Sequence, residues 1–474
     1  MSGDLALMSA TELLGQYRRK KLSPVEVTRA VLERSANCND ILNAFCLIDE
    51  KSALASAQQA ETRWRQGRPR GLVDGVPTAI KDTMLTRGWP TRRGSCTVSA
   101  DGPWEEDSPA VARLREHGAV LIGKTTTPEF GWKAVTDSPL SGITRNPWNP
   151  GRTPGGSSGG AAVAAAMGAG ALHLGGDGGG SIRIPAAFCG VYGFKATFGR
   201  VPLYPQPVPG TITHPGPITR TVADAALMLT VIGEPDPRDW LALPYDHRDY
   251  RLGVEEGVRD LRIAFSRNLG YVDVDPEIAD LLDKAAQVFE ELGASVGEVD
   301  PGFENPRRAF DVYYSIRFTF VVDRLTERQR ELLDPGLMEM AEEGRRFGVR
   351  EVMEAEATRA ALGRHMNLFH QTYDLLLTPQ LPLTAFEVGL EFPQNRGMRR
   401  WLDWSPFTYP FNFTQQPAAS VPCGLTRDGL PVAIQIVGPR YREDLVLKAS
   451  RAYECARPFK VPPLPGSAAP HARG

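Results

Sequence analysis

The hydrophobic positions of this chain form short continuous runs, and segments with a helical period lie between them. The runs Val76–Ile80 and Val120–Ile122 predict buried strands, because apolar runs of this length are typical of a covered sheet. Between them, Ser108–Glu116 predicts a helix, since a serine followed by a proline is common where helices begin. This alternation predicts an α/β fold in which a large mixed, mostly parallel β-sheet is sandwiched between α-helices.

The segments on either side of this region are predicted to be helical at first and to return to the sheet later. Capping boxes in the segments Ser9–Glu12 and Ser23–Glu26 indicate two N-terminal helices. From about 306 to 371 the pattern is charged and helical, so we expect these helices to cover one end of the active site, whose candidate residues are described below. Late strands that rejoin the sheet are predicted at Leu375–Pro379 and Val432–Val437.

The length of 474 residues, of which 42% are hydrophobic, is ample for a large buried core. Length alone would favour about three domains. We instead predict one domain over residues 1–460 with its core at about 65–220, because the candidate catalytic residues are spread along the chain and the late strands belong to the same sheet. The remaining segment, 461–474, is rich in Pro, Ala and Gly and is predicted to be a mobile tail.

Charge and cysteine usage exclude several classes of protein. The formal net charge is −2, which argues against a nucleic-acid partner, because neutralising phosphates needs a basic surface. The six cysteines form no C-x-x-C pair, and a fold of this size needs no disulfide. No apolar run reaches membrane-spanning length and no signal peptide is recognisable. We therefore predict a cytoplasmic protein without membrane contact.

The most informative residues lie in two glycine loops and at one strand end. Gly178, Gly179 and Gly180 precede Ser181, so several backbone N–H groups can converge beside a hydroxyl, as an oxyanion hole requires. Ser181 is therefore the candidate nucleophile, with its own N–H as a further donor to the oxyanion hole.

A serine hydroxyl needs a base before it can attack. The loop Gly155–Gly160 supplies a second hydroxyl, Ser157, if the alanine-rich helix predicted at Ala161–Met167 folds the chain back. Lys81 ends the strand predicted at Val76–Ile80, and a buried lysine can lose its proton and act as the base. Lys81, Ser157 and Ser181 are thus the predicted catalytic residues.

These segments resemble the amidase signature family of serine hydrolases. The resemblance rests on GGSSGG around Ser157, GGGSIRIPAAFCG around Ser181 and AIKD around Lys81, and it extends to LNAF at 42–45, IGKT at 122–125, TRNPW at 144–148 and SVPCG at 420–424. It implies a Ser-Ser-Lys triad of Lys81, Ser157 and Ser181, a non-proline cis peptide before Ser157 and an oxyanion hole at 178–181. It also implies an ion pair between Asp177 and Arg183 that braces this loop. Because members of the family often form dimers, it further implies a homodimer.

Other motifs in the sequence are given a structural interpretation. Gly118–Thr125 satisfies the phosphate-loop pattern G-x-x-x-x-G-K-[ST], but its middle residues read as the strand itself. His365 and His370 lack the spacing of a zinc helix, so we predict neither a metal site nor a cofactor. His173 is expected to be packed in the core. His214 is expected in a loop near the site, where we favour an ordinary loop residue over the alternative, a contact with substrate.

The resemblance implies an amidase that cleaves C–N bonds of small amides through a Ser181 acyl-enzyme. Trp132, Ser158 and Phe407 are the candidate substrate contacts, and the neighbouring aromatic residues favour an aryl or alkyl amide, with carbamates and esters as side substrates. These neighbouring aromatic residues are Trp401, Trp404, Tyr409, Phe411 and Phe413.

Two alternative functions remain open at this point. The first is the glutamine-hydrolysing component, the A chain, of a tRNA-dependent amidotransferase. Against it, Ser405 stands where the aspartate of that component is expected, and Glu351–His370 lacks its tyrosine cluster. The second is an inactive binding or assembly component, which the intact triad opposes.

Overall fold

The centre of the computed structural model is an eleven-stranded sheet. The structure describes residues 4–208, 210–394 and 396–463, so the predicted tail lies outside the described residues from 464 onward. Across the sheet the strands follow the order β1 (Phe45–Ile48), β3 (Val120–Thr125), β2 (Pro77–Lys81), β6 (Leu172–Asp177), β8 (His214–Thr219), β7 (Tyr192–Lys195), β12 (Ala418–Leu425), β13 (Pro431–Val437), β11 (Leu375–Pro379), β9 (Arg262–Phe265) and β10 (Ser295–Glu298). A separate small ribbon pairs β4 (Asp137–Ser138) with β5 (Gly142–Ile143).

The sheet is mixed, and its parallel pairs lie toward its two ends. Strand β2 runs parallel to β3 and β6, and β9 runs parallel to β10 and β11. The central neighbours from β6 to β13 pair antiparallel, so the parallel share is smaller than the sequence predicted. One reason is that β12 and β13 are joined by the turn Thr426–Leu430, and a short turn can only reverse the chain.

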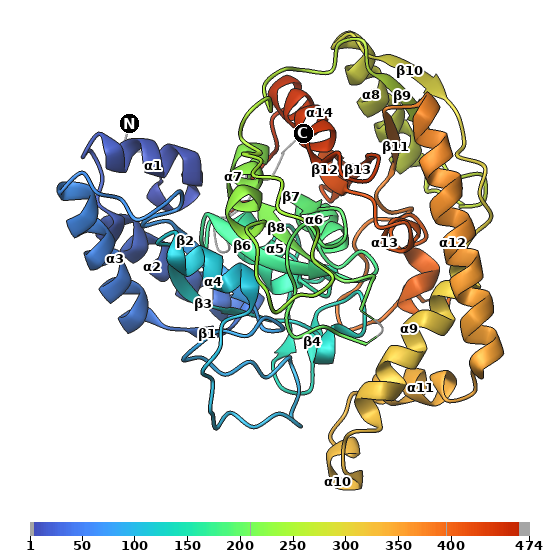
Figure 1. Cartoon of the computed structure of the whole chain (residues 1–474), viewed down its shortest axis with the longest axis horizontal. Coiled ribbons are helices and arrows are strands. Elements are labelled where there is room, and N and C mark those ends of the chain that lie inside the picture. The colour runs from blue at the N-terminus through green and yellow to red at the C-terminus, as the bar shows by residue number, and fades with distance from the viewer. Residues whose placement is uncertain (1–3, 209, 395, 464–474) are drawn as a thin grey trace, which may run out of the picture.

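Helices pack around this sheet, as predicted (Figure 1). Helices α5 and α6 contact each other and the central strands, and α7 and α14 form a second such pair. In the described residues outside 306–371, the helices are α1 (Ala10–Arg18), α2 (Pro24–Leu42), α3 (Glu50–Arg65), α4 (Pro109–Glu116), α5 (Gly159–Met167), α6 (Arg183–Cys189), α7 (Val222–Ile232), α8 (Pro276–Glu291), α13 (Pro410–Phe413) and α14 (Glu443–Ala456). The segment predicted to be charged and helical contains α9 (Arg307–Val322), α10 (Glu327–Arg330), α11 (Pro335–Gly344) and α12 (Val349–Thr372). Short 3-10 turns are η1 (Leu5–Leu7), η2 (Glu129–Gly131) and η3 (Trp401–Trp404).

The starts of the first two helices follow directly from the sequence. Both predicted capping boxes are present: Ser9 caps α1 with Glu12, and Ser23 caps α2 with Glu26. Helix α4 begins after Ser108 as expected, although the side chain of Ser108 makes no capping hydrogen bond. Serine, glutamate and proline at these positions are local start signals, so the sequence alone was enough to predict where these helices begin.

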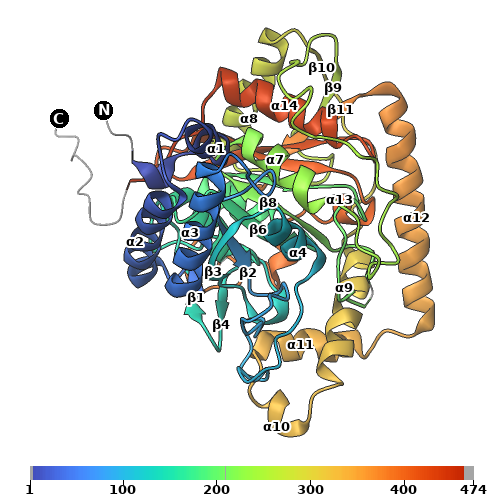
Figure 2. The same ribbon diagram turned by 60° about the vertical axis from the view of Figure 1, so that its left-hand side comes forward.

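The buried apolar side chains form two clusters. The first core lies around β2, β3, β6 and the alanine-rich helix α5, all nine residues of which are buried. The second core is built from α9, α11 and α12 together with the aromatic segment 401–413. Figures 1 and 2 both show α1–α3 at one end of the molecule and α12 at the other. No helix of the described residues is both long and apolar enough to cross a membrane.

The structure shows which secondary structure is adopted by two motifs discussed above, the phosphate-loop pattern Gly118–Thr125 and the segment around His214. Val120–Thr125 is the buried strand β3 as predicted, and the ammonium of Lys124 donates to the Met84 carbonyl at 2.7 Å rather than facing a nucleotide. The expected loop at His214, by contrast, is the strand β8. The sequence did not predict this strand, because the segment contains Pro215 and Pro217 and proline is rare inside sheets. It is tolerated here since β7 pairs with β8 only near Thr219.

Candidate active site

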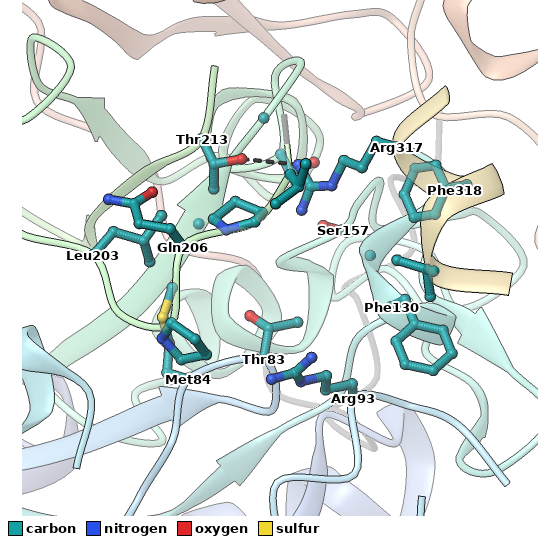
Figure 3. Close-up of a pocket in the computed structure, with 18 of the residues that line it drawn as sticks. Thr83, Met84, Arg93, Phe130, Ser157, Leu203, Gln206, Thr213, Arg317 and Phe318 are labelled. Carbon is teal, nitrogen blue, oxygen red and sulfur yellow. Dashed lines mark hydrogen bonds between the residues drawn. The ribbon is translucent and has the colours of Figure 1, made fainter. Parts of the chain in front are cut away.

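A cavity of about 430 Å³ contains all three predicted catalytic residues, and its size is that of a small-molecule site (Figure 3). Its floor holds Lys81, Ser157 and Ser181. Helix α9 forms one wall and the segment 203–208 another. The remaining lining residues are Thr83, Met84, Arg93, Phe130, Gly131, Gly176, Gly178, Thr213 and Arg324.

Lys81 is buried at the end of β2, with 2% of its surface exposed. Its Nζ lies 2.6 Å from Ser157 Oγ, 2.9 Å from Ser158 Oγ and 3.4 Å from the Gly176 carbonyl oxygen. Desolvation lowers the pKa of Lys81 to about 7, while the charge of Asp177 acts against this shift. The group is therefore available as a neutral base close to neutral pH.

The partners of Lys81 also determine where its lone pair points. A neutral amine has two N–H donors and one lone pair. The Gly176 carbonyl can only accept a hydrogen bond, and Ser158 Oγ can donate its own proton to the same carbonyl at 3.2 Å while it accepts from Lys81. Both donors of the neutral amine are then satisfied, so its lone pair faces the hydroxyl of Ser157. Ser158 thus orients the base.

Ser157 and Ser181 are brought together by contacts between their loops. The peptide bond between Gly156 and Ser157 is cis, as the resemblance implied. A Cβ on Gly156 would lie 2.7 Å from the Val135 backbone, so only glycine fits at this position. The Ser158 N–H donates to the Ser181 carbonyl at 3.1 Å and ties one loop to the other. Within the described residues no hydrogen bond joins the hydroxyls of Ser157 and Ser181, a contact that often tightens only when substrate binds.

The N–H groups predicted to form an oxyanion hole have unequal roles. The Gly180 N–H donates to Asp177 Oδ1 at 2.7 Å and is already used. In the described part of the chain, the N–H groups of Gly178, Gly179 and Ser181 have no partner. These three groups beside the Ser181 hydroxyl remain available to a developing oxyanion.

Behind this loop, the predicted ion pair between Asp177 and Arg183 is confirmed. Arg183 Nε lies 3.0 Å from Asp177 Oδ2, and both side chains are fully buried. Burial acts to raise the pKa of Asp177, but the charge of Arg183 holds it well below its usual range. Arg183 also donates to Gln435 Oε1 and Asn412 Oδ1, each at 2.7 Å. The network fixes the strand end from which the oxyanion loop departs.

The three predicted substrate contacts lie outside the lining of this cavity. Trp132 and Phe407 are buried in the second core, and Ser158 holds Lys81. The neighbouring aromatic side chains are likewise packed in that core, where Trp401 approaches within 3.0 Å of the Cβ position of Gly179. Whether Trp132, Ser158 or Phe407 touches substrate stays a prediction. His214 is also buried, and its Nδ1 lies 3.2 Å from the Asp177 carbonyl oxygen.

The cavity walls contain residues that sequence analysis missed. Tyr314, Arg317, Phe318 and Val321 line the cavity from α9, and their i, i+3, i+4, i+7 spacing was a readable sign of one helical face. Arg93 carries no comparable signal, because it reaches the cavity from an irregular segment. Among the described residues that line the cavity there is no Asp or Glu. The described residues also contain no group of three or more His, Cys, Asp or Glu that could hold a metal ion.

Comparisons with known proteins find similarity along most of the chain. A family model described as Amidase matches residues 26–447. An acylamidase of Rhodococcus erythropolis is 37% identical over 465 residues, which cover 96% of this chain and 97% of the relative. The A component of the glutamyl-tRNA(Gln) amidotransferase of Gloeobacter violaceus is 35% identical over 482 residues, which cover 95% of this chain and 96% of the relative. The crystal structure of a bacterial aryl acylamidase of the amidase signature family superposes with a TM-score of 0.89 at 33% identity, covering 95% of this chain and 96% of the other.

Proposed function

Because this chain belongs to the amidase signature family, whose enzymes act on C–N amide bonds, we propose that it hydrolyses small aryl or alkyl amides through an acyl-enzyme on Ser181. The observation that carries the proposal is the 2.6 Å contact between Lys81 Nζ and Ser157 Oγ, made by a lysine whose burial lowers its pKa to about 7. A lysine in this state is a base of suitable strength for a neutral-pH reaction.

The proposed first step forms the bond between Ser181 Oγ and the acyl carbon. The Ser181 proton moves to Ser157 Oγ, while the Ser157 proton moves to the lone pair of Lys81. The carbonyl oxygen becomes an oxyanion, which the free N–H groups of Gly178, Gly179 and Ser181 stabilise.

The second step breaks the C–N bond. The leaving amine takes a proton from Ser157, and Lys81 returns a proton to Ser157. Water then attacks the acyl-enzyme, loses its proton to the same relay and releases the acid together with the free Ser181 hydroxyl. The nucleophile of the first step, the base, the proton relay and the oxyanion donors in this cycle all belong to the chain itself.

The apolar wall of the cavity supports an aryl or alkyl group on the substrate. Phe130, Tyr314 and Phe318 line it, and flat aromatic faces favour contact with rings and hydrocarbon chains. The similarity to an acylamidase and to an aryl acylamidase points the same way. Carbamates and esters have the same acyl carbon within reach of Ser181 and are proposed as side substrates.

A second candidate function is the A component of a tRNA-dependent amidotransferase, which the similarity to such proteins favours. That role requires a site for free glutamine, which carries an ammonium group as well as a carboxylate. No carboxylate lines the described cavity, and Ser405 donates to the Trp401 carbonyl away from it. An ammonium group would enter this cavity without a counter-charge, so we favour the free-standing hydrolase.

The test is hydrolysis of a small panel by the purified chain alone. The panel contains an aliphatic amide, an anilide, an aryl carbamate, an ester and glutamine, with Ser181→Ala as the control for each. Turnover of the anilide or the aliphatic amide that disappears in Ser181→Ala is the expected result. Glutamine cleavage only after addition of partner proteins would instead identify the transamidation component.

A fluorophosphonate probe separates an active enzyme from the remaining alternative, an inactive binding or assembly component. Only an activated serine reacts with such a probe, so mass spectrometry should find the label on Ser181. An unlabelled protein that also hydrolyses no member of the panel would overturn the proposal.

A further inference from the structure

Three arginines line the active-site cavity, and none of them has a carboxylate partner among the described residues. Arg324 is exposed and its guanidinium stacks over the ring of Phe320 at 3.8 Å, whereas Arg93 and Arg317 are partly buried. Arg317 comes from α9, and Arg93 comes from the segment after β2; Figure 3 shows them on opposite sides of the cavity with Ser157 between them in the view. Within the described residues neither guanidinium forms an ion pair. Of these two side chains, only that of Arg317 makes a hydrogen bond among the described residues: its Nη1 donates to Thr213 Oγ1 at 2.9 Å.

This arrangement differs from the way the chain treats its other buried arginine at the site. Arg183 is enclosed by Asp177 and by three neutral acceptors, so its charge is compensated. Arg93 and Arg317 instead oppose each other electrostatically. Burial, first of all, lowers the pKa of both, and the charge of Arg93 adds to the shift at Arg317. The charge of Asp82 acts against the shift at Arg93, and Tyr314 acts against the shift at Arg317, but neither residue forms an ion pair with these arginines among the described residues. Two partly buried cations of this kind favour an anion between or beside them.

Arg317 is also close to the chemistry. Its Nη1 lies 3.5 Å from the Cβ position of Gly178, whose N–H is one of the free donors beside Ser181. A molecule that places its acyl carbon at Ser181 therefore has the guanidinium of Arg317 within its reach. The hydrocarbon part between the two groups would lie against Phe318 and Phe130.

The backbone holds Arg93 in an unusual conformation that aims it into the cavity. Its φ is 57°, in the left-handed region that side chains other than glycine rarely adopt. The Arg93 N–H donates to the Asp82 carbonyl at 3.1 Å, and the Arg93 carbonyl accepts from the Phe130 N–H at 2.8 Å. Phe130, which also lines the cavity, has a φ of 50°. Such conformations persist where the surroundings enforce them, and they cluster at functional sites.

We propose that Arg317 and Arg93 form an anion subsite, so that the preferred substrates are amides that carry a carboxylate on their acyl or amine part. This inference rests on the proposed amidase function and narrows it. The guanidinium fork matches a carboxylate in two parallel hydrogen bonds, which fixes orientation as well as charge. Free glutamine fits less well, because the subsite takes its carboxylate while its ammonium group finds no acid on the described wall.

The test compares matched substrates that differ only in the charged group. N-phenylsuccinamate and neutral N-phenylbutanamide place the difference on the acyl side, and 4-acetamidobenzoate and 4-acetamidobenzamide place it on the amine side. We expect kcat/KM to be about 10- to 100-fold higher for the anionic member of one pair, as for a charge-assisted hydrogen bond. Equal values within both pairs in the unmodified protein overturn the subsite without any variant.

Variants then assign the preference to the two arginines. Arg317→Met and Arg93→Met should each remove most of the preference, chiefly through KM of the anionic substrate, and change KM of the neutral one little. Arg350→Gln, which removes an exposed arginine of α12 with 87% of its side chain accessible, should keep the preference. The comparison is made at about pH 9, where Lys81 stays neutral even if loss of the Arg317 charge raises its pKa. If the variants leave the ratio of kcat/KM within each pair unchanged, the arginines act on the oxyanion, the base or the fold, and the proposal fails.

Binding distinguishes failure of this inference from failure of the amidase function. Ser181→Ala cannot form the acyl-enzyme but keeps both arginines, so calorimetry can measure N-phenylsuccinamate and N-phenylbutanamide directly. Binding of the anion at least about tenfold tighter than the neutral analogue supports the subsite even if no amide is cleaved. Equal binding, or absence of binding by both, overturns the subsite even if amides are cleaved.

Discussion

The pH dependence of the reaction tests the role of Lys81 most directly. The proposed mechanism needs the neutral amine of Lys81, and desolvation lowers the pKa of this group to about 7 from the ordinary lysine value of 10.5. Lowering the pH should therefore protonate Lys81, which then cannot act as a base, before the protein unfolds. We expect kcat/KM to rise with pH and to level off above about pH 8.

The size of the effect follows from the titration of one group. With a pKa of about 7, the neutral fraction of Lys81 is about one half at about pH 7, one tenth at about pH 6 and one hundredth at about pH 5. The rate should therefore fall about fivefold from about pH 7 to 6 and about tenfold from about pH 6 to 5. An exposed lysine with a pKa of 10.5 would be neutral in only about one molecule in three thousand at about pH 7.

The assay is kcat/KM for a neutral amide between about pH 5 and 10, with Ser181→Ala measured in parallel to subtract background hydrolysis. The rate of fluorophosphonate labelling of Ser181 should follow the same curve, because labelling needs the same base. Arg317→Gln supplies an internal check. The positive charge of Arg317 lowers the pKa of Lys81, so its removal should move the curve to higher pH.

A flat profile between about pH 5 and 9 would refute the reasoning, and so would a rise centred near the ordinary lysine value. Either result would mean that Lys81 is not the group whose proton controls the rate. Circular dichroism at each pH separates this outcome from unfolding, since a loss of structure would lower the rate without reporting on the base.

Three further changes have expected outcomes. Ser181→Ala should lower kcat by at least about 10³-fold with an unchanged melting temperature, because the hydroxyl supplies the nucleophile and little packing. Asp177→Asn should lower the free energy of unfolding in urea by about 3–5 kcal/mol, because it leaves the buried charge of Arg183 uncompensated. Gly160→Ala should cost about 1–3 kcal/mol in the same assay, because its Cβ would lie 2.5 Å from the Ala44 carbonyl oxygen.

Matched substitutions show whether these effects come from the stated contacts. Asp374→Asn breaks a surface pair with Arg262 and should cost less than about 1 kcal/mol. Gly363→Ala lies within α12, where a Cβ meets nothing within 4 Å, so it should stabilise the helix by about 0.5–1 kcal/mol. Similar losses for the control and the test variant would contradict the packing or charge argument concerned.

The parts of the molecule that sequence predicted well are those set by local chemistry. Ser23 and Glu26 lie a few positions apart and cap α2 wherever that helix packs. The loops around Ser157 and Ser181 are likewise defined by their own glycines. Their meeting with Lys81 was predicted from the need of a serine nucleophile for a base and from the resemblance, because no local pattern defines it, and the structure places all three in one cavity.

The parts that sequence predicted poorly depend on distant neighbours. Strand β8 was missed because its prolines are compatible with a strand only where a partner is absent on one side. The aromatic residues around Phe407 were expected at the cavity, but composition does not distinguish a core aromatic from a lining one. Arg93 reaches the cavity only because the segment after β2 and the turn at Phe130 hold each other. The homodimer stays a prediction.

The separation of the two cores has a consequence for how such a molecule can diversify. Lys81 and Ser157 are held by β2 and α5, which pack in the first core, whereas Tyr314 and Phe318 face the cavity from α9 in the second core. We expect substitutions of Tyr314 and Phe318 to alter which substrates bind and to leave β2 and α5 intact, whereas Arg317 on the same face also lowers the pKa of Lys81. Directed evolution confined to Tyr314 and Phe318 can therefore search for new substrates at little risk to the chemistry.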